Sequence, residues 1–123
     1  MALRCLIVDD NLRFLEVAGS SLGRDGIDVV GTATTSSKAL QQTEKLRPEV
    51  VLVDISLGDE SGFELTRQLV DAFPYLLSRI VLISTRVEDD FADLIAASPA
   101  AGFIAKSRLS AKAVHELVSR TGS

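Results

Sequence analysis

Five side chains with chemically useful groups each follow a short apolar run of the chain. Asp9 and Asp10 follow the first such run, Asp54 and Ser84 follow two runs further along, and Lys106 follows the last. In an open parallel sheet, ligands bind at the edge formed by the carboxyl ends of the strands. If the apolar runs are strands of such a sheet, three carboxylates, a hydroxyl and an ammonium group meet at one edge.

Three carboxylates at one edge predict a bound divalent cation. Converging carboxylates repel one another, and at least one pKa is raised unless a cation offsets the charge. Hard oxygen ligands with open positions suit Mg²⁺, which keeps some of its waters and binds phosphoryl oxygens. Taken singly, adjacent acids are most often a solvated turn, and a single lysine is usually a surface residue. The combination of Asp9, Asp10, Asp54 and Lys106 is what predicts a site.

The elements that position these residues alternate between strand and helix. Apolar runs of a few residues, bounded by polar ones, predict buried strands, and apolar residues at helical spacing mark the helices between them. The predicted strands are Leu6–Val8, Ile27–Gly31, Val50–Val53, Ile80–Ile83 and Gly102–Ala105. The first predicted helix runs from about Leu12 to Leu22, and the second ends near Leu46.

Hydroxyl side chains mark where several of these helices begin. Ser36 or Ser37 is expected to cap the second helix, Ser61 the third and Ser110 the last, because each precedes an apolar pattern of helical period. The fourth helix is expected to start at the acidic segment 88–90 and to turn Leu94 inward.

Five strands alternating with five helices predict an α/β fold of the doubly wound (βα)5, flavodoxin-like kind. Almost continuously apolar strands are typical of a parallel sheet covered by helices on both faces. Right-handed crossovers leave few topologies for such a sheet. A length of 123 residues corresponds to one domain, which we place at residues 1–121.

Composition narrows the class of protein. With 13 basic and 17 acidic residues the net charge is −4, which argues against direct nucleic-acid binding. A single cysteine allows neither an internal disulfide nor a thiolate zinc cluster, and a cytoplasmic location is the natural expectation. No apolar run reaches the roughly 18 residues of a membrane span, so no membrane association is expected.

The chemically useful residues, taken in order, resemble a known family. Asp9–Asp10, Asp54, Ser84 and Lys106, each at its own strand end, resemble the receiver domain of bacterial response regulators over essentially the whole chain. The resemblance implies the strand order 2-1-3-4-5. It also implies a phosphorylation switch of two-component signal transduction rather than a metabolic enzyme. Such a domain assists its own phosphotransfer and autodephosphorylation.

The resemblance assigns a role to each acidic residue. Asp54 would be the nucleophile that accepts the phosphoryl group and forms an aspartyl phosphate. Asp10 and Asp54 would ligate Mg²⁺ directly. Asp9 would act through water, and Ser56 would offer its backbone carbonyl.

The resemblance also places the remaining groups. Lys106 would pair with one phosphoryl oxygen and Ser84 would donate a hydrogen bond to another. Phe103 occupies the aromatic switch position of the family and would turn inward as Ser84 shifts. Phosphorylation would then favour one packing of these two residues over another.

Partners follow from the same resemblance. The phosphoryl donor would be a sensor histidine kinase or a phosphotransfer protein. Output, and a possible homodimer, would use the face formed by the fourth helix, the strand 102–105 and the helix after Ser110. A helix-turn-helix domain could follow in a longer transcriptional regulator, or the receiver could stand alone.

Two positions depart from the family pattern. Ser107 follows Lys106 where the family usually has a proline with a cis peptide bond, so a trans or a strained bond is expected here. Gly58 stands where the loop after Asp54 commonly has a proline, and it should loosen that loop.

Three other functions remain as alternatives. A haloacid-dehalogenase-like phosphatase also uses an aspartate nucleophile, but it needs a second aspartate two residues later, where this chain has Ser56. A flavodoxin-like electron carrier or dinucleotide binder would want a glycine- or hydroxyl-rich phosphate loop in place of Asp9–Asp10–Asn11. A receiver-like module that binds proteins without phosphorylation is the third.

Overall fold

The computed structural model describes residues 2–86 and 88–121, so Met1 of the expected domain lies outside the described residues. Five strands form the main sheet: β1 (Arg4–Val8), β2 (Asp28–Ala33), β3 (Val50–Asp54), β6 (Ile80–Ser84) and β7 (Gly102–Ala105). The α-helices are α1 (Leu12–Arg24), α2 (Ser36–Leu46), α3 (Gly62–Ala72), α4 (Ala92–Ala97) and α5 (Ala111–Thr121). The short elements are β4 (Ser56–Leu57), β5 (Glu60–Ser61) and the 3₁₀ turns η1 (Pro74–Leu76), η2 (Glu88–Phe91) and η3 (Lys106–Arg108).

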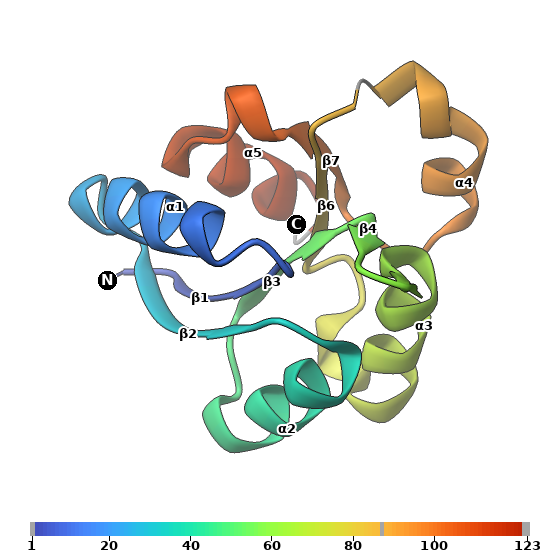
Figure 1. The fold of residues 1–123 in the computed structure, drawn as a ribbon, viewed down its shortest axis with the longest axis horizontal. Helices are drawn as coiled ribbons and strands as arrows, with labels where there is room; N and C mark the ends of the chain where they lie inside the picture. Colours follow the sequence, from blue (N-terminus) through green and yellow to red (C-terminus); the bar gives the residue numbers. More distant parts are fainter. Residues whose placement is uncertain (1, 87, 122–123) are drawn as a thin grey trace.

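The main sheet is parallel, with strand order β2-β1-β3-β6-β7. Counting only these five strands, this is the predicted order 2-1-3-4-5, and the doubly wound α/β fold is confirmed. β3 lies at the centre, where Val53 pairs with Val8 of β1 on one side and Leu82 of β6 on the other. The carboxyl ends of β1, β3, β6 and β7 therefore meet at one edge (Figure 1).

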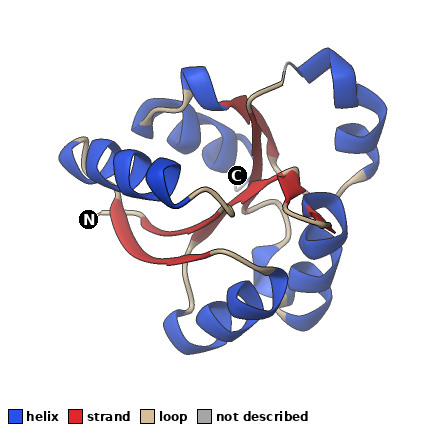
Figure 2. Ribbon diagram, in the orientation of Figure 1, coloured by secondary structure: helices blue, strands red, loops and turns tan. Residues whose placement is uncertain are grey.

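Helices cover both faces of this sheet, and the alternation of side chains along each strand divides the core into two layers. Figure 2 shows helices on both sides of the sheet. Cys5 and Ile7 of β1 pack with α1 and α5, whereas Leu6 and Val8 pack on the side of α2 and α3. Strands buried on both faces explain the continuous apolar runs. Within the described part of the chain, no helix combines the length and apolar character that a membrane crossing requires.

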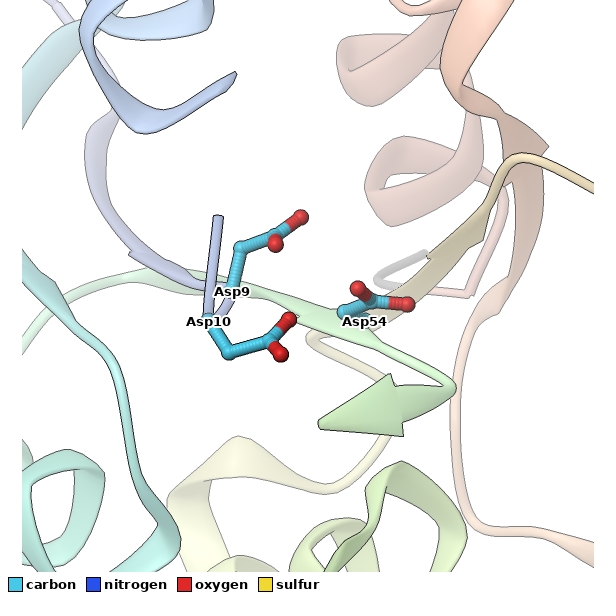
Figure 3. A group of neighbouring side chains, drawn as sticks. All are labelled: Asp9, Asp10 and Asp54. Carbon is cyan, nitrogen blue, oxygen red and sulfur yellow. The ribbon is translucent and has the colours of Figure 1, made fainter. Parts of the chain in front are cut away.

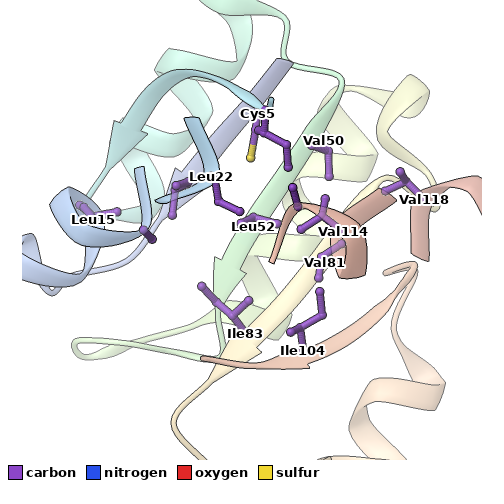
Figure 4. Packing of buried hydrophobic residues seen from close by; sticks show 14 residues of the cluster. Cys5, Leu15, Leu22, Val50, Leu52, Val81, Ile83, Ile104, Val114 and Val118 are labelled. Carbon is purple, nitrogen blue, oxygen red and sulfur yellow. The ribbon is translucent and has the colours of Figure 1, made fainter. Parts of the chain in front are cut away.

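The layer beneath α1 and α5 fixes two loops of the sheet edge. Leu22 of α1 and Val114 of α5 are almost completely buried against Leu52 and Val81 of the central strands (Figure 4). Truncating a buried leucine costs about 2–5 kcal/mol, so these contacts hold both helices firmly. They set the positions of the loops that follow β1 and β7.

The cap of α2 differs from the prediction. Thr35, rather than Ser36 or Ser37, has the extended cap backbone, and its Oγ1 accepts the Lys38 N–H at 3.2 Å. Ser36 is already the first helical residue, so the predicted cap lay too late in the chain. The other two predicted caps are confirmed by hydroxyl acceptors at 3.4 Å for Ser61 and 3.1 Å for Ser110.

The fourth helix also differs. The segment from Glu88 to Phe91 is a 3₁₀ turn, and the α-helix begins only at Ala92. A 3₁₀ turn advances about 120° per residue instead of 100°. Side-chain directions counted from Glu88 at α-helical spacing are therefore wrong by the time the chain reaches Leu94. Leu94 is 54% exposed and does not face the core, while Phe91 and Ile95 do pack against it.

A small hairpin follows β3 where the sequence predicts only a loop. β4 and β5 pair antiparallel, with Ser56 opposite Ser61. Gly58 occupies the turn with a φ of 61°, a conformation that glycine adopts without strain. The hairpin gives this segment a defined path back to α3.

Candidate functional site

β1 delivers Asp9 and Asp10 to the carboxyl edge of the sheet in very different surroundings. Asp9 is fully buried, and its backbone N–H donates to the Ala33 carbonyl at 3.0 Å. Its Oδ1 accepts the Asn11 backbone N–H at 2.9 Å. Asp10 is exposed. The backbone therefore fixes the Asp9 carboxylate, whereas Asp10 is open to solvent.

Asp54 ends the central strand β3 and is only 6% exposed. Its Oδ1 accepts the Ser56 backbone N–H at 3.1 Å, which leaves Oδ2 to face the rest of the site. Gly62 packs against the same turn so closely that a Cβ there would overlap the Asp54 carbonyl oxygen and lie 2.8 Å from Ile55 Cα. This close packing fixes the backbone that carries Asp54.

The three carboxylates gather between the ends of β1 and β3 (Figure 3). Asp9, Asp10 and Asp54 each offer an oxygen within 4.8 Å of the other two. Burial raises the pKa of Asp54, and the negative charge of Asp9 raises it further. The Ser56 N–H and Lys106 lower that pKa without reversing the net rise. The site thus disfavours the charge of its own central carboxylate.

Lys106 comes from the end of β7 and reaches into this cluster. Its Nζ lies 2.6 Å from Asp9 Oδ2 and 3.2 Å from Asp54 Oδ2. Burial works against the ammonium charge, but the contact with Asp9 and the charge of Asp54 outweigh it and raise the pKa of Lys106. Lys106 therefore stays protonated at neutral pH and offsets part of the negative charge.

Ser84 ends β6 between the strands of the other two groups. It is 3% exposed and pairs in register with Ala105, the residue before Lys106. Its Oγ accepts the Arg86 backbone N–H at 3.0 Å. The hydroxyl is thus held by its own loop and lies between the strand ends that carry Asp54 and Lys106.

The residues present fit a hard divalent cation. All the candidate ligand atoms of the cluster are carboxylate oxygens, the type that Mg²⁺ prefers. Asp9 Oδ2 is buried, and Lys106 Nζ, 2.6 Å away, is its charged neighbour. Each carboxylate oxygen can accept more than one contact, so Oδ2 keeps acceptor capacity for a cation or its waters.

The structure brings the predicted residues together. Asp9, Asp10, Asp54 and Lys106 form one cluster, with Ser56 bound to Asp54 and Ser84 at the adjoining strand end. Their placement follows from the parallel topology, because each ends or follows a strand of the same sheet.

Two further residues at the site were not predicted from the sequence. Phe14 places its ring 4.3 Å from Lys106 Nζ, a contact between α1 and the end of β7 that no sequence pattern encodes. Asn11 caps α1 by accepting the Phe14 N–H at 3.0 Å. Its position immediately before an amphipathic helix was a usable signal, since asparagine is a favoured N-cap.

The sequence matches the family model of the response regulator receiver domain over residues 5–118. The chain belongs to the response regulator receiver family. This membership excludes the haloacid dehalogenases and the flavodoxin-like carriers as the family of this chain. It also identifies the chain as a receiver domain of two-component systems.

Relatives and solved structures agree with this assignment. The receiver is 30% identical over 109 residues to the response regulator GacA of Pseudomonas viridiflava, covering 85% of this chain and 48% of GacA. It superposes on a Burkholderia pseudomallei response regulator, which contains a phosphorylated aspartic acid and calcium, with a TM-score of 0.79, 25% identity and coverage of 94% and 66%. For Vibrio cholerae CheY4 the TM-score is 0.81 at 22% identity, with 98% of each chain covered. The chain spans about half the length of the curated relatives it matches.

The structure bears on one expected departure from the family, the bond before Ser107, and on the expected aromatic switch position, Phe103. No cis peptide bond occurs in the described ranges, so the Lys106–Ser107 bond is trans. Phe103 is partly buried and packs against the apolar layer shared with α3, close to the edge that holds Ser84.

Proposed function

We propose that this receiver is a phosphorylation switch that accepts a phosphoryl group on Asp54 with the help of Mg²⁺. The observation that carries the proposal is the contact of one ammonium group, Lys106 Nζ, with both Asp9 and Asp54 beside a cluster of three carboxylates. A purely structural ion pair would not need the third acid, Asp10, which is exposed to solvent.

Four residues would hold the metal. Asp10 and Asp54 would be the direct ligands, Asp9 would act through water, and Ser56 would offer its backbone carbonyl. When bound, Mg²⁺ offsets the carboxylate charge and binds a phosphoryl oxygen. The arrangement of this chain's own groups does the rest, because phosphoryl transfer depends mainly on positioning and charge stabilisation.

Asp54 Oδ2 is the nucleophilic atom. Oδ1 is engaged by the Ser56 N–H, while Oδ2 faces Lys106 at 3.2 Å. The Oδ2–phosphorus bond forms as the bond from phosphorus to the donor imidazole nitrogen breaks, and that nitrogen keeps the electron pair. Lys106 pairs with one phosphoryl oxygen. The Ser84 hydroxyl, whose Oγ accepts the Arg86 N–H, donates its own hydrogen to another.

The partner would be a sensor histidine kinase or a phosphotransfer protein that carries phosphohistidine. Output, and homodimer formation where it occurs, would use the face of α4, β7 and α5, which includes Phe103. The domain would act as a cytoplasmic switch without catalysing a metabolic reaction, apart from its own phosphotransfer and autodephosphorylation. A role in transcription regulation would follow if the full protein resembles GacA in length.

Intact-protein mass spectrometry tests the proposal. Wild type and Asp54→Ala are incubated with acetyl phosphate, with Mg²⁺ or with a chelator. We expect one phosphoryl adduct in the wild type that requires Mg²⁺ and that is absent from Asp54→Ala. No adduct, with acetyl phosphate or with a phosphohistidine donor protein, would favour the alternative of a phosphorylation-independent binding module.

A further inference from the structure

Lys106 has a third neighbour besides the two carboxylates. Its Nζ lies 4.3 Å from the centroid of the Phe14 ring. A cation within about 6 Å of a ring centroid is attracted by the negative face of the ring, most strongly where water is excluded. The Lys106 side chain is only 12% exposed, so this condition is met.

The contact completes a closed chain of interactions that begins and ends at Asp9. Asp9 Oδ1 accepts the Asn11 N–H, and Asn11 Oδ1 accepts the Phe14 N–H. The Phe14 ring lies over the Lys106 ammonium, and that ammonium forms an ion pair with Asp9 Oδ2. The cap of α1 and the end of β7 are thereby tied to the same carboxylate, and the ring is placed by the backbone of the site itself.

Packing alone does not account for an aromatic residue here. Phe14 is half-buried at the margin of the apolar layer, beside a hollow of about 120 Å³ that Val17 and Leu109 also line. An aliphatic side chain could also cover this apolar margin. Only an aromatic ring also offers a face to the cation.

We infer that Phe14 is a positioning residue for Lys106 and holds its ammonium group at the shared edge of Asp9 and Asp54. The inference rests on the proposed function. Because the ring covers the ammonium, Lys106 meets less competing water. The ring contact also remains when a phosphoryl group replaces the carboxylates as partner of Nζ. Lys106 is then already in place for the incoming group.

The functional test compares Phe14→Leu, Phe14→Tyr and Val17→Ala. Phosphoryl uptake from acetyl phosphate is followed by intact mass at saturating Mg²⁺, after melting curves have shown that each variant is folded. Phe14→Leu should lower the uptake rate roughly three- to thirty-fold, the factor equivalent to a cation–π contact. Phe14→Tyr keeps the ring and should restore the rate. Val17→Ala changes the same hollow without touching a ring and should leave it unchanged.

A second readout does not depend on phosphorylation. The ring should displace the NMR resonances of the Lys106 ε-methylene group from those of the three other lysines in wild type and Phe14→Tyr, and not in Phe14→Leu. Undisplaced Lys106 resonances in the wild type would overturn the inference, as would a wild-type uptake rate in folded Phe14→Leu. A wild type that takes up no phosphoryl group would contradict the proposed function, while the lysine resonances would still decide whether Phe14 holds Lys106.

Discussion

Opposing electrostatic effects act on the negative charge of Asp54. Burial and the neighbouring Asp9 disfavour its charge, while Lys106 and the Ser56 N–H favour it, and the net effect raises its pKa. The metal-free fold thus holds the Asp54 carboxylate where its negative charge is costly. Stability and function therefore make opposite demands on this side chain.

Removing the charge should stabilise the metal-free protein. An acid whose folded pKa is raised gives up stability as the pH rises through that pKa. Asp54→Asn should therefore melt at a higher temperature than wild type at pH 7, in the presence of a chelator. The difference should vanish below about pH 4, where an ordinary aspartate is protonated in the unfolded chain as well.

Melting curves between pH 3 and pH 8 test this expectation. Asp71→Asn, an exposed position on α3, is the matched control and should change little at any pH. A lower melting temperature for Asp54→Asn at pH 7 would mean that the ion pair with Lys106 outweighs burial.

The charge of Lys106, in contrast to that of Asp54, should stabilise the metal-free protein. Lys106→Met leaves the buried Asp9 without its cation, which should cost about 3 kcal/mol of unfolding free energy without metal. Mg²⁺ binding should tighten, because the competing ammonium is gone, while phosphoryl uptake should fall at least tenfold. Chemical denaturation with and without Mg²⁺ measures the first two effects. Lys112→Met, exposed on α5, is the control, and weaker Mg²⁺ binding in Lys106→Met would contradict the assignment.

At the scale of elements, Gly62 in the turn from β3 to α3 has the least room for a Cβ among the described glycines. A Cβ on Gly62 would meet backbone atoms of Asp54 and Ile55, which cannot move aside as a flexible side chain can. Gly62→Ala should destabilise the protein by about 3 kcal/mol or more and abolish phosphorylation. Gly19→Ala is the counterpart in α1, where nothing lies within 4 Å, and it should stabilise by about 1 kcal/mol. Equal stability of the two variants in urea would refute this account of the turn.

The start of α2 gives a smaller test at the same scale. Thr35 Oγ1 accepts the Lys38 N–H, so Thr35→Ala should cost about 1 kcal/mol. Ser36→Ala and Ser37→Ala lie within the first turn and should change the unfolding free energy by less than about 0.5 kcal/mol. Thermal denaturation of the three variants distinguishes the caps, and a larger loss for Ser36→Ala would restore the cap expected from sequence.

For the molecule as a whole, the sequence predicts the sheet and its site because both depend on simple patterns. Strands buried on both faces, such as Val50–Val53, must be apolar throughout, and the groups that follow them must share one edge. The order of residues along the chain is therefore enough to bring Asp9, Asp54, Ser84 and Lys106 to a single site.

The remaining features depend on tertiary contacts or on local winding. The Phe14–Lys106 contact joins the first helix to the last strand, and no periodicity reports it. The exposure of Leu94 depends on a 3₁₀ turn that replaces the first turn of an expected helix. The hairpin of β4 and β5 has only two residues in each strand, too few for an alternating pattern.

The central claim is that Asp54 carries the phosphoryl group, and borohydride trapping tests it most directly. Borohydride reduces an acyl phosphate to the alcohol, so an aspartyl phosphate becomes homoserine, which peptide mass spectrometry locates. After treatment with a phosphoryl donor, we predict homoserine at position 54 with Mg²⁺ and none with a chelator. Homoserine at position 9 or 10, or a phosphoryl group that resists borohydride on His115, would contradict the account.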